Sequence, residues 1–309
     1  MTHRPDAETT SGDVDILHHL GIVATDMNAT IQRYERLGFR FTPLSLPQIQ
    51  LAPGAAPEPV GVGNRCAIFE ENYLEVLAIV SKERWSAITP AQRGPFDIDR
   101  PLRRYEGMHV LHFGADDIDV THRRLRAQGT AASDVRPYQR PVDTLEGTAL
   151  MRARCVSFPA HANPEALVQI AQHVTPELVL QPRYMSHPNG ARGIVEVIVC
   201  SEDAASLAAK YALYTGRTAQ RRDAVHVVEL GRSRVVVADP ADLGSELPGF
   251  APPTTPHISG FVVRVDALAR TREHLDRENV AFRVHRNRLM IDAGDAGGVT
   301  LLFEEGDAR

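Results

Sequence analysis

The chain has 309 residues, which is enough for two domains of ordinary size. Its 43% hydrophobic and 24% charged residues are typical of a soluble globular protein, and a net charge of −5 argues against a nucleic-acid partner. No apolar run approaches the length of a membrane span, and the polar N-terminus lacks a secretory signal. We therefore expect a cytoplasmic protein with no membrane partner, whose residues 1–13 form a disordered tail.

The first predicted elements lie between residues 16 and 80. An apolar strand opens the unit, Asp26 caps a helix, and apolar residues recur at helical spacing from Met27 to Leu37 before Gly38 ends the helix. Three strand-like runs follow, at 40–46, 64–70 and 73–80. The unit has the order βαβββ.

The same order returns three times along the chain, which marks an internal repeat. The later copies open near residues 108, 192 and 257, and their predicted helix caps are Asp117, Asp203 and Asp266. Their later strands are expected at 149–158 and 166–174, then 225–231 and 233–239, then 281–287, 288–294 and 298–305. The segment 81–106 reads mostly as a linker, with a short helix after Trp85.

These four units predict an α+β fold made of four βαβββ modules. Two units together can pair their strands into a cup-shaped half-barrel with helices outside and a cavity inside, so four units make two cups. We expect an N-terminal domain at 14–180, a linker at 181–192 that contains the turn signal Pro188-Asn189-Gly190, and a C-terminal domain at 193–306.

This order of elements resembles the vicinal oxygen chelate superfamily, which includes glyoxalase I, extradiol dioxygenases and bleomycin-binding proteins. The first half is most similar to glyoxalase-like domain proteins through the strings "HHLGIVATD", "GVGNRCAIFEENYLEVLAI", "IAQHVTPELV" and "HPNG". The resemblance implies a small-molecule substrate in a cup that holds a divalent metal. The family's usual ligands are a His from the first strand of a unit and a Glu from its last strand.

In the first unit, the resemblance points to His19 and Glu75 as metal ligands. The family's first-strand His lies seven residues before the capping acid, which selects His19 rather than His18. Because neighbouring side chains of a strand point to opposite faces, we expect His18 to face the helix side. Glu75 shares a face with Tyr73 and Leu77, and a Glu in an apolar strand is costly to bury without a partner.

The second unit leaves the remaining ligands open. His109 and His112 lie on opposite faces of one strand, so only one can line the cup; we prefer His109 as a ligand and keep His112 as a substitute that binds substrate. On the last strand His173 is a candidate ligand and Gln169 a substrate contact, where the family usually has Glu.

Two further residues match a family motif before the third strand. Asn64 and Arg65 are candidate substrate contacts, and Arg65 could bind a carboxylate in a bidentate manner. The second cup, in contrast, has Glu196 and Ser259 at the first-strand positions and Glu304 on its last strand. Two Glu residues without a His are a weak set of metal ligands, so this cup is expected to be structural or to bind something apolar.

The resulting hypothesis is a metal-dependent lyase or isomerase acting through an enolate, with Fe, Mn, Ni or Zn as the ion and the Glu75 carboxylate as proton carrier. One alternative is a metal-free protein that binds a drug or metabolite. A less favoured one is an extradiol-type dioxygenase, because the C-terminal cup lacks a first-strand His. Since one chain supplies two cups, either a monomer or a homodimer would be compatible with a complete site.

Overall fold

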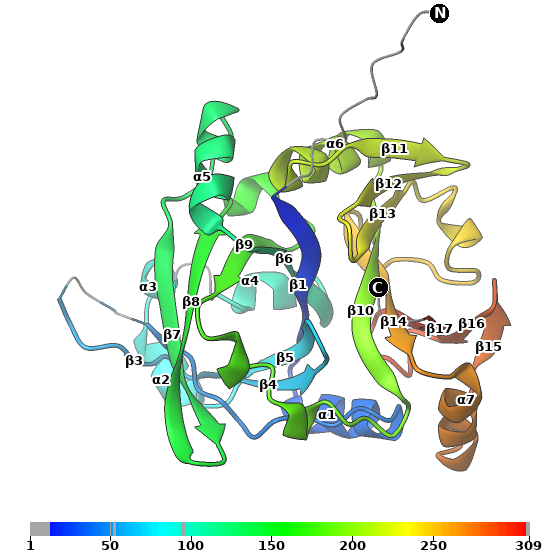
Figure 1. The fold of residues 1–309 in the computed structure, drawn as a ribbon, viewed down its shortest axis with the longest axis horizontal. Helices are drawn as coiled ribbons and strands as arrows, with labels where there is room; N and C mark the ends of the chain where they lie inside the picture. The colour runs from blue at the N-terminus through cyan, green and yellow to red at the C-terminus, as the bar shows by residue number, and fades with distance from the viewer. Residues whose placement is uncertain (1–12, 50, 52–53, 94–96, 307–309) are drawn as a thin grey trace, which may run out of the picture.

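The computed structural model describes residues 13–49, 51, 54–93 and 97–306, and it has two curled mixed sheets with helices packed on them (Figure 1). This confirms the expected α+β fold. Asp13, which the sequence assigned to a disordered tail, is described and forms an ion pair with Arg124; residues 1–12 of that predicted tail lie outside the described residues. In the described part of the chain, no helix has the length and apolar character needed to cross a membrane.

The first sheet has seven strands in the order β4-β5-β1-β6-β9-β8-β7. Its centre is the antiparallel pair β1 and β6, and each of these strands has its own unit's last strand, β5 or β9, parallel on its outer side. The strands are β1 (Val14–Val23), β4 (Val62–Ile68), β5 (Tyr73–Ile79), β6 (Gly107–Ala115), β7 (Arg136–Thr144), β8 (Gly147–Ser157) and β9 (Leu167–His173). A separate hairpin pairs β2 (Gln48–Ile49) with β3 (Glu58–Pro59).

The second sheet repeats this plan in the order β11-β12-β13-β10-β14-β17-β16-β15. Again the two opening strands, β10 and β14, pair antiparallel at the centre, with β13 and β17 parallel outside them. The strands are β10 (Ala191–Cys200), β11 (Ala219–Arg222), β12 (Val225–Glu229), β13 (Arg234–Ala238), β14 (His257–Val265), β15 (Arg283–His285), β16 (Arg288–Ile291) and β17 (Thr300–Glu305).

Each unit carries one long helix, and three of the four predicted caps are confirmed. Backbone N–H groups in the first turn donate to the side chains of Asp26, Asp117 and Asp203. The helices of the chain are α1 (Met27–Arg36), α2 (Lys82–Ala87), α3 (Pro90–Arg93), α4 (Asp99–Leu102), α5 (Ile118–Ala127), α6 (Ala204–Thr215) and α7 (Leu268–Arg277). Short 3-10 turns lie at η2 (Ala160–Ala162), η3 (Pro176–Leu178), η4 (Pro182–Tyr184) and η5 (Leu243–Ser245).

Two local predictions are wrong. The expected strand at 40–46 is irregular backbone in which Ser45 alone forms an isolated bridge, to Asn64. The predicted cap Asp266 is also not the cap of α7, because the cap position is Ala267 and makes no side-chain hydrogen bond. The Asp266 carboxylate instead forms ion pairs with Arg192 and Arg270.

A β-bulge in β1 is the feature that shapes the first cup. Leu17 is opposite Phe113 and His19 is opposite His112, so His18 is an extra residue without a partner on β6. A bulge re-aims the side chain of the extra residue and leaves nearby backbone groups outside the ladder. The same irregularity recurs in β10, where Val195 is the extra residue beside Glu196.

The backbone groups beside the two bulges are bonded across the boundary between the halves. The buried Asn72 side chain donates to the carbonyls of Leu17 and Ile194 and accepts from the Ile194 N–H, while the Leu17 N–H donates to Ser233 Oγ at 2.7 Å. Asn72 and Ser233 each directly precede the strand that closes their unit, β5 or β13. These contacts hold β1 and β10 side by side (Figure 1).

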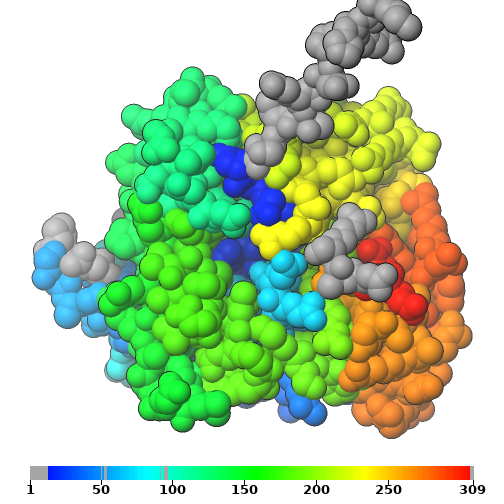
Figure 2. Space-filling model, in the orientation of Figure 1, coloured from blue at the N-terminus to red at the C-terminus, as the bar shows by residue number. Residues whose placement is uncertain are grey.

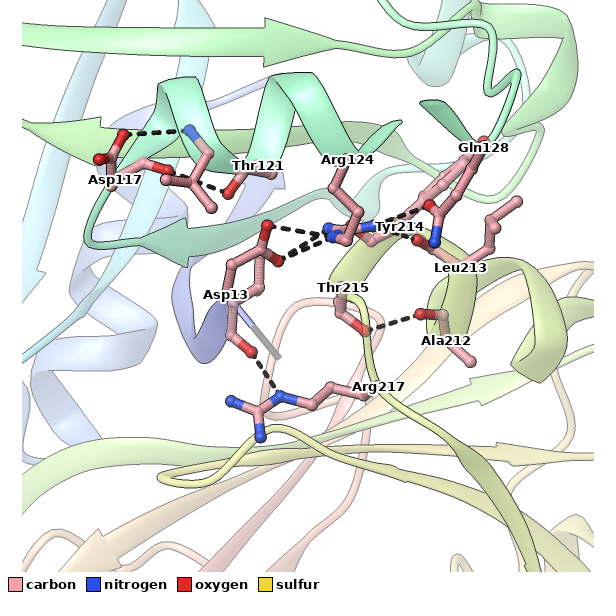
Figure 3. A network of polar contacts seen from close by, with 12 residues as sticks. Asp13, Asp117, Thr121, Arg124, Gln128, Ala212, Leu213, Tyr214, Thr215 and Arg217 are labelled. Atoms are coloured by element: carbon pink, nitrogen blue, oxygen red, sulfur yellow. Dashed lines mark hydrogen bonds and ion pairs between the residues drawn. The ribbon is translucent and has the colours of Figure 1, made fainter. Parts of the chain in front are cut away.

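The two halves also share one hydrophobic core. A single buried cluster contains residues of both sheets, such as Phe39 and Phe113 from the first half and Tyr211 and Phe303 from the second. In space-filling view the blue-to-green half and the yellow-to-red half adjoin along this boundary (Figure 2). On one side of it, Arg124 of α5 pairs with Asp13 and donates to the last carbonyls of α6 at Leu213 and Tyr214 (Figure 3).

The second cup is filled by its own chain. Leu243 and Leu247, which lie in and after η5, pack against Ile198, Val262 and Met290 of the second sheet. Gly260 allows this packing, because a Cβ there would lie 3.0 Å from the Leu247 methyl carbons. Glu196 occupies the position that corresponds to His19 and forms ion pairs with two arginines.

Candidate active site in the N-terminal cup

The concave face of the first sheet encloses a cavity of about 80 Å³. It lies among β1, β4, β5 and β6 on one side and β7, β8 and β9 on the other. Its polar lining consists of His18, His19, Asn64, Tyr73, Glu75, His112, Tyr138, Arg140, Cys155, Gln169 and His173. The sequence-predicted residues His19, Asn64, Glu75, His112, Gln169 and His173 are therefore brought together here.

Strand alternation places most of these side chains. Tyr73, Glu75 and Leu77 of β5 all line the cavity, as do Gln169 and His173 of β9, which is the period-two pattern of a strand with one face toward a cavity. The exception is His18, which lines the same cavity as its neighbour His19. The expectation that His18 faces the helix side is wrong, because the bulge turns both imidazoles inward.

The four cup histidines contact one another directly. His18 Nδ1 and His19 Nδ1 are 2.7 Å apart, so one of these nitrogens donates and the other accepts. The ring centroids of His18 and His173 are 4.2 Å apart, as are those of His19 and His112. Tyr73 stacks on the other face of His19 at 4.4 Å.

Burial keeps these imidazoles neutral. It lowers the pKa of His112 to about 3 and that of His173 to about 4, and the Arg140 charge further lowers the pKa of His173. Burial, with further contributions from neighbouring imidazoles, lowers the pKa values of His18 and His19 well below 6.5. Near pH 7 each imidazole therefore carries one N–H and one nitrogen lone pair, which is the neutral state in which imidazole binds metals.

Glu75 is the carboxylate of the cavity and is also buried. Burial raises the pKa of Glu75, while the hydrogen bond that Asn64 Nδ2 donates to Glu75 Oε1 and the nearby Arg140 charge oppose that rise. The other oxygen, Glu75 Oε2, lies 3.8 Å from His19 Nε2. Asn64 thus orients the carboxylate, and a raised pKa suits a group that takes up and returns a proton.

Several buried polar atoms of the cluster have no hydrogen-bond partner. They are His18 Nε2, Asn64 Oδ1, His112 Nε2 and His173 Nδ1. A buried polar atom without a partner costs free energy, and such atoms in a native protein call for a ligand, a water molecule or an ion. As the side chains lie, no three His, Cys, Asp or Glu groups of the described residues converge as a metal site.

Two predicted residues lie outside the cup. His109 Nε2 bonds the Tyr105 carbonyl at 2.8 Å and its ring packs on Tyr105, so the structure favours His112 over His109 as the histidine of β6 that faces His19. Arg65 donates from Nε to the Thr42 carbonyl and does not line the cavity, because it alternates with Asn64 and Cys66 on β4.

Arg140 is a cup residue that sequence reasoning missed. It lies on β7, whose sequence RPYQRPVDT contains Pro137 and Pro141 and therefore does not read as a strand. The strand forms because β7 is the last strand of its sheet, where proline is tolerated at the free edge. No motif signalled Arg140 in the sequence.

A second cavity of about 280 Å³ adjoins the first. Leu77, Val110 and Leu167 line both cavities, and Ile98 and Phe158 add further apolar surface to the second. His109 is part of its wall. The cup thus lies beside a larger cavity with which it shares part of its apolar wall.

The C-terminal cup presents no comparable set. Glu196, like His19, follows a bulged residue and pairs with the first residue of the closing strand, here Arg234 rather than Tyr73. Its carboxylate is bound by Arg234 and Arg288, and Arg288 also binds Glu304. Internal ion pairs occupy the place where the first cup has its imidazoles.

Comparison with known protein families settles the relationship of the chain. A family model described as a glyoxalase-like domain matches residues 17–215, more than half of the sequence. The chain belongs to this family. The match covers the whole N-terminal cup and continues through β10 and α6 of this glyoxalase-like protein, and the resemblance to the vicinal oxygen chelate superfamily is confirmed. A search of curated proteins found no match.

Solved structures share the fold of this glyoxalase-like protein at low sequence identity. A hypothetical protein from Staphylococcus aureus aligns with a TM-score of 0.62 and 12% identity, covering 94% of this chain and 99% of the other. A Mn(II)-bound glyoxalase from Novosphingobium aromaticivorans gives 0.54 and 10%, covering 95% and 83%. A triple mutant of 4-hydroxymandelate synthase from Streptomyces coelicolor gives 0.53 and 12%, covering 96% and 94%.

Proposed function

We propose that the N-terminal cup is the site of a divalent-metal-dependent lyase or isomerase that acts on a small oxygenated substrate. One observation carries the proposal: one cavity gathers four buried imidazoles beside the Glu75 carboxylate, and His18 Nε2, His112 Nε2 and His173 Nδ1 have no hydrogen-bond partner among the described residues. Membership of the glyoxalase-like family and the Mn(II)-bound glyoxalase among the structural neighbours support it.

The donor set suits a divalent ion in type and in protonation state. Imidazole nitrogen and carboxylate oxygen are ligands for Fe, Mn, Ni and Zn. His19, Glu75, His112 and His173 would hold the ion, with His18 positioned against His19 and His173. A bound divalent cation would polarise two adjacent substrate oxygens and stabilise negative charge that develops on them.

Side chains of the cup would transfer the proton and exclude water. Glu75 accepts a proton from the carbon next to a substrate carbonyl and returns it to a neighbouring atom, and the Asn64 hydrogen bond holds its carboxylate in place meanwhile. Leu77, Val110 and Leu167 keep water away from the reacting end of the substrate.

A metal-free binding protein is the second candidate, and one observation favours it. The His18–His19 hydrogen bond satisfies two nitrogens internally, and three donors do not converge among the described side chains. An extradiol-type dioxygenase stays the least favoured, since the corresponding carboxylate of the C-terminal cup, Glu196, is bound by arginines.

Metal analysis separates these candidates. We expect untagged protein to contain close to one equivalent of Fe, Mn, Ni or Zn, and metal-depleted protein to bind Mn(II) in an electron paramagnetic resonance titration. His112→Ala should weaken Mn(II) binding by at least tenfold, whereas His109→Ala, on the same strand but outside the cup, should leave it unchanged. Absence of metal together with no Mn(II) binding would favour the metal-free protein instead.

A further inference from the structure

Arg140 is a buried cation without an acidic partner. Its side chain lines the cup, the residue is 7% exposed, and its one hydrogen bond to the described residues runs from Nη1 to Ser45 Oγ at 2.8 Å. Within the described part of the chain, no carboxylate lies within ion-pair distance of its guanidinium group. Glu75 contributes only a longer-range attraction.

Elsewhere the chain neutralises its buried arginines. Two further arginines in the described residues are buried, and both are paired: Arg93 with Asp97 and Asp99, and Arg264 with Glu70. The pairing is expected, because an uncompensated buried charge is strongly destabilising and a guanidinium group stays protonated. Arg140 departs from this pattern, and its side chain lines both the cup and a neighbouring pocket that contains Ser45.

We infer that Arg140 binds the carboxylate group of the substrate, so that the substrate class is a small carboxylic acid with an apolar substituent. This rests on the proposed function of the cup and narrows it. A planar guanidinium matches a carboxylate in shape and charge and can bond both of its oxygens. The apolar part of such a molecule would lie against Leu77, Val110 and Leu167, which line both the cup and the second cavity.

The polar lining of the cup agrees with an incoming anion. Arg140 is the one arginine among the described residues that line the cup, and no lysine is among them. Arg65, which the sequence suggested for this task, points away from the cavity toward the Thr42 carbonyl. The substrate-anchoring arginine therefore lies on the edge strand of the second unit and not on β4.

The experiment compares acids with their amides, which differ in charge but hardly in shape. Binding of 3-phenylpropanoate and 3-phenylpropanamide to metal-depleted protein is measured by calorimetry, so that no ion contributes to carboxylate binding. We expect the acid to bind more tightly, and Arg140→Met to weaken acid binding by about 10- to 100-fold while amide binding changes little. Arg65→Met is the matched control and should keep the preference for the acid.

Thermal unfolding distinguishes a binding arginine from a structural one. Without ligand, Arg140→Met should unfold at the same temperature as the parent protein or higher, because the substitution removes an uncompensated buried charge. Equal binding of acid and amide by the parent protein, failure of both to bind, or inorganic phosphate competing as well as the acid would overturn the inference. So would a lower unfolding temperature of Arg140→Met with acid and amide binding weakened equally.

The result of the acid and amide binding experiment can be interpreted independently of the Mn(II) binding assay. An Arg140-dependent preference for the acid in a protein that never binds Mn(II) would disprove the proposed lyase or isomerase and leave the carboxylate site standing. Mn(II) binding without any preference for the acid would do the reverse.

Discussion

The histidines of this chain differ in which groups contact their two ring nitrogens, and this difference decides what each ring can do. His187, at the turn between the halves, has both nitrogens occupied: Nε2 donates to the Ile68 carbonyl and Nδ1 accepts from the Arg40 N–H. The neutral ring is required for this pair of bonds, since a protonated ring has no acceptor. Three cup histidines, in contrast, each have one buried ring nitrogen without a partner among the described residues, namely His18, His112 and His173.

This arrangement predicts acid sensitivity at His187. Burial lowers the pKa of His187 to about 4, below its unfolded value near 6.5, so the stability it contributes is present above pH 6.5 and is lost as the pH falls toward 4. We expect His187→Gln to lower the free energy of unfolding at pH 7, and the gap to the parent protein to shrink by about 2 kcal/mol at pH 5. Urea unfolding at the two pH values measures both, and an equal gap at pH 7 and pH 5 would contradict the assignment.

Spacing and alternation identify some cup residues from sequence and miss others. His19 and Glu75 can be found because one lies seven residues before a helix cap and the other interrupts an apolar strand. The inward turn of His18 could not be found, because a bulge depends on the register of two strands distant in sequence. The same limit led to His109 being preferred over His112.

At the scale of elements, the opening and closing strands of the four units could be predicted because each is an apolar run at a regular distance from a helix cap. The error at 40–46 has a physical cause: this segment leaves the sheet, with Ser45 near Arg140, and its apolar residues pack elsewhere, as Phe41 does in the shared core. Apolar content alone does not specify ladder pairing. The edge strand β7 was missed for the opposite reason, since its prolines conceal a real strand.

The bulges also explain how the central strands β1 and β10 of the two sheets are joined through side chains. Asn72 satisfies three backbone groups of β1 and β10, and Ser233 satisfies one. Both side chains substitute for ladder partners that the bulges remove.

The number of bonds predicts a graded loss of stability. We expect Asn72→Ala to lower the free energy of unfolding by about 3 kcal/mol and Ser233→Ala by about 1 kcal/mol. The first substitution leaves three buried backbone groups unpaired and the second leaves one. Denaturant titration of the two variants checks the order. Equal losses, or a larger loss for Ser233→Ala, would count against this account of the joint.

For the whole molecule, the shared core makes the two halves one cooperative unit. The largest cluster of buried apolar side chains runs through both sheets: Phe39 stacks on Phe303, Phe113 packs against Tyr211, and the Tyr34 hydroxyl donates to the Ala296 carbonyl. The second cup is filled by Leu243 and Leu247 and bound internally by Glu196 and Arg288.

We therefore expect a single thermal unfolding transition in calorimetry, with equal calorimetric and van't Hoff enthalpies. The Arg288→Met variant, altered only in the second cup, should shift that one transition without splitting it. Two resolved transitions in either protein would show that the halves unfold separately.

The extra residue in β1 has a consequence for how this chain tolerates changes of length. Elsewhere in a strand, deleting one residue inverts the facing of every side chain on one side of the cut. At His18 the ladder already skips a position, so a deletion there joins Leu17 to His19 in the spacing that Phe113 and His112 already have. A homologue that lacks this residue would keep the sheet and the second imidazole intact while presenting one fewer imidazole to whatever enters the cup.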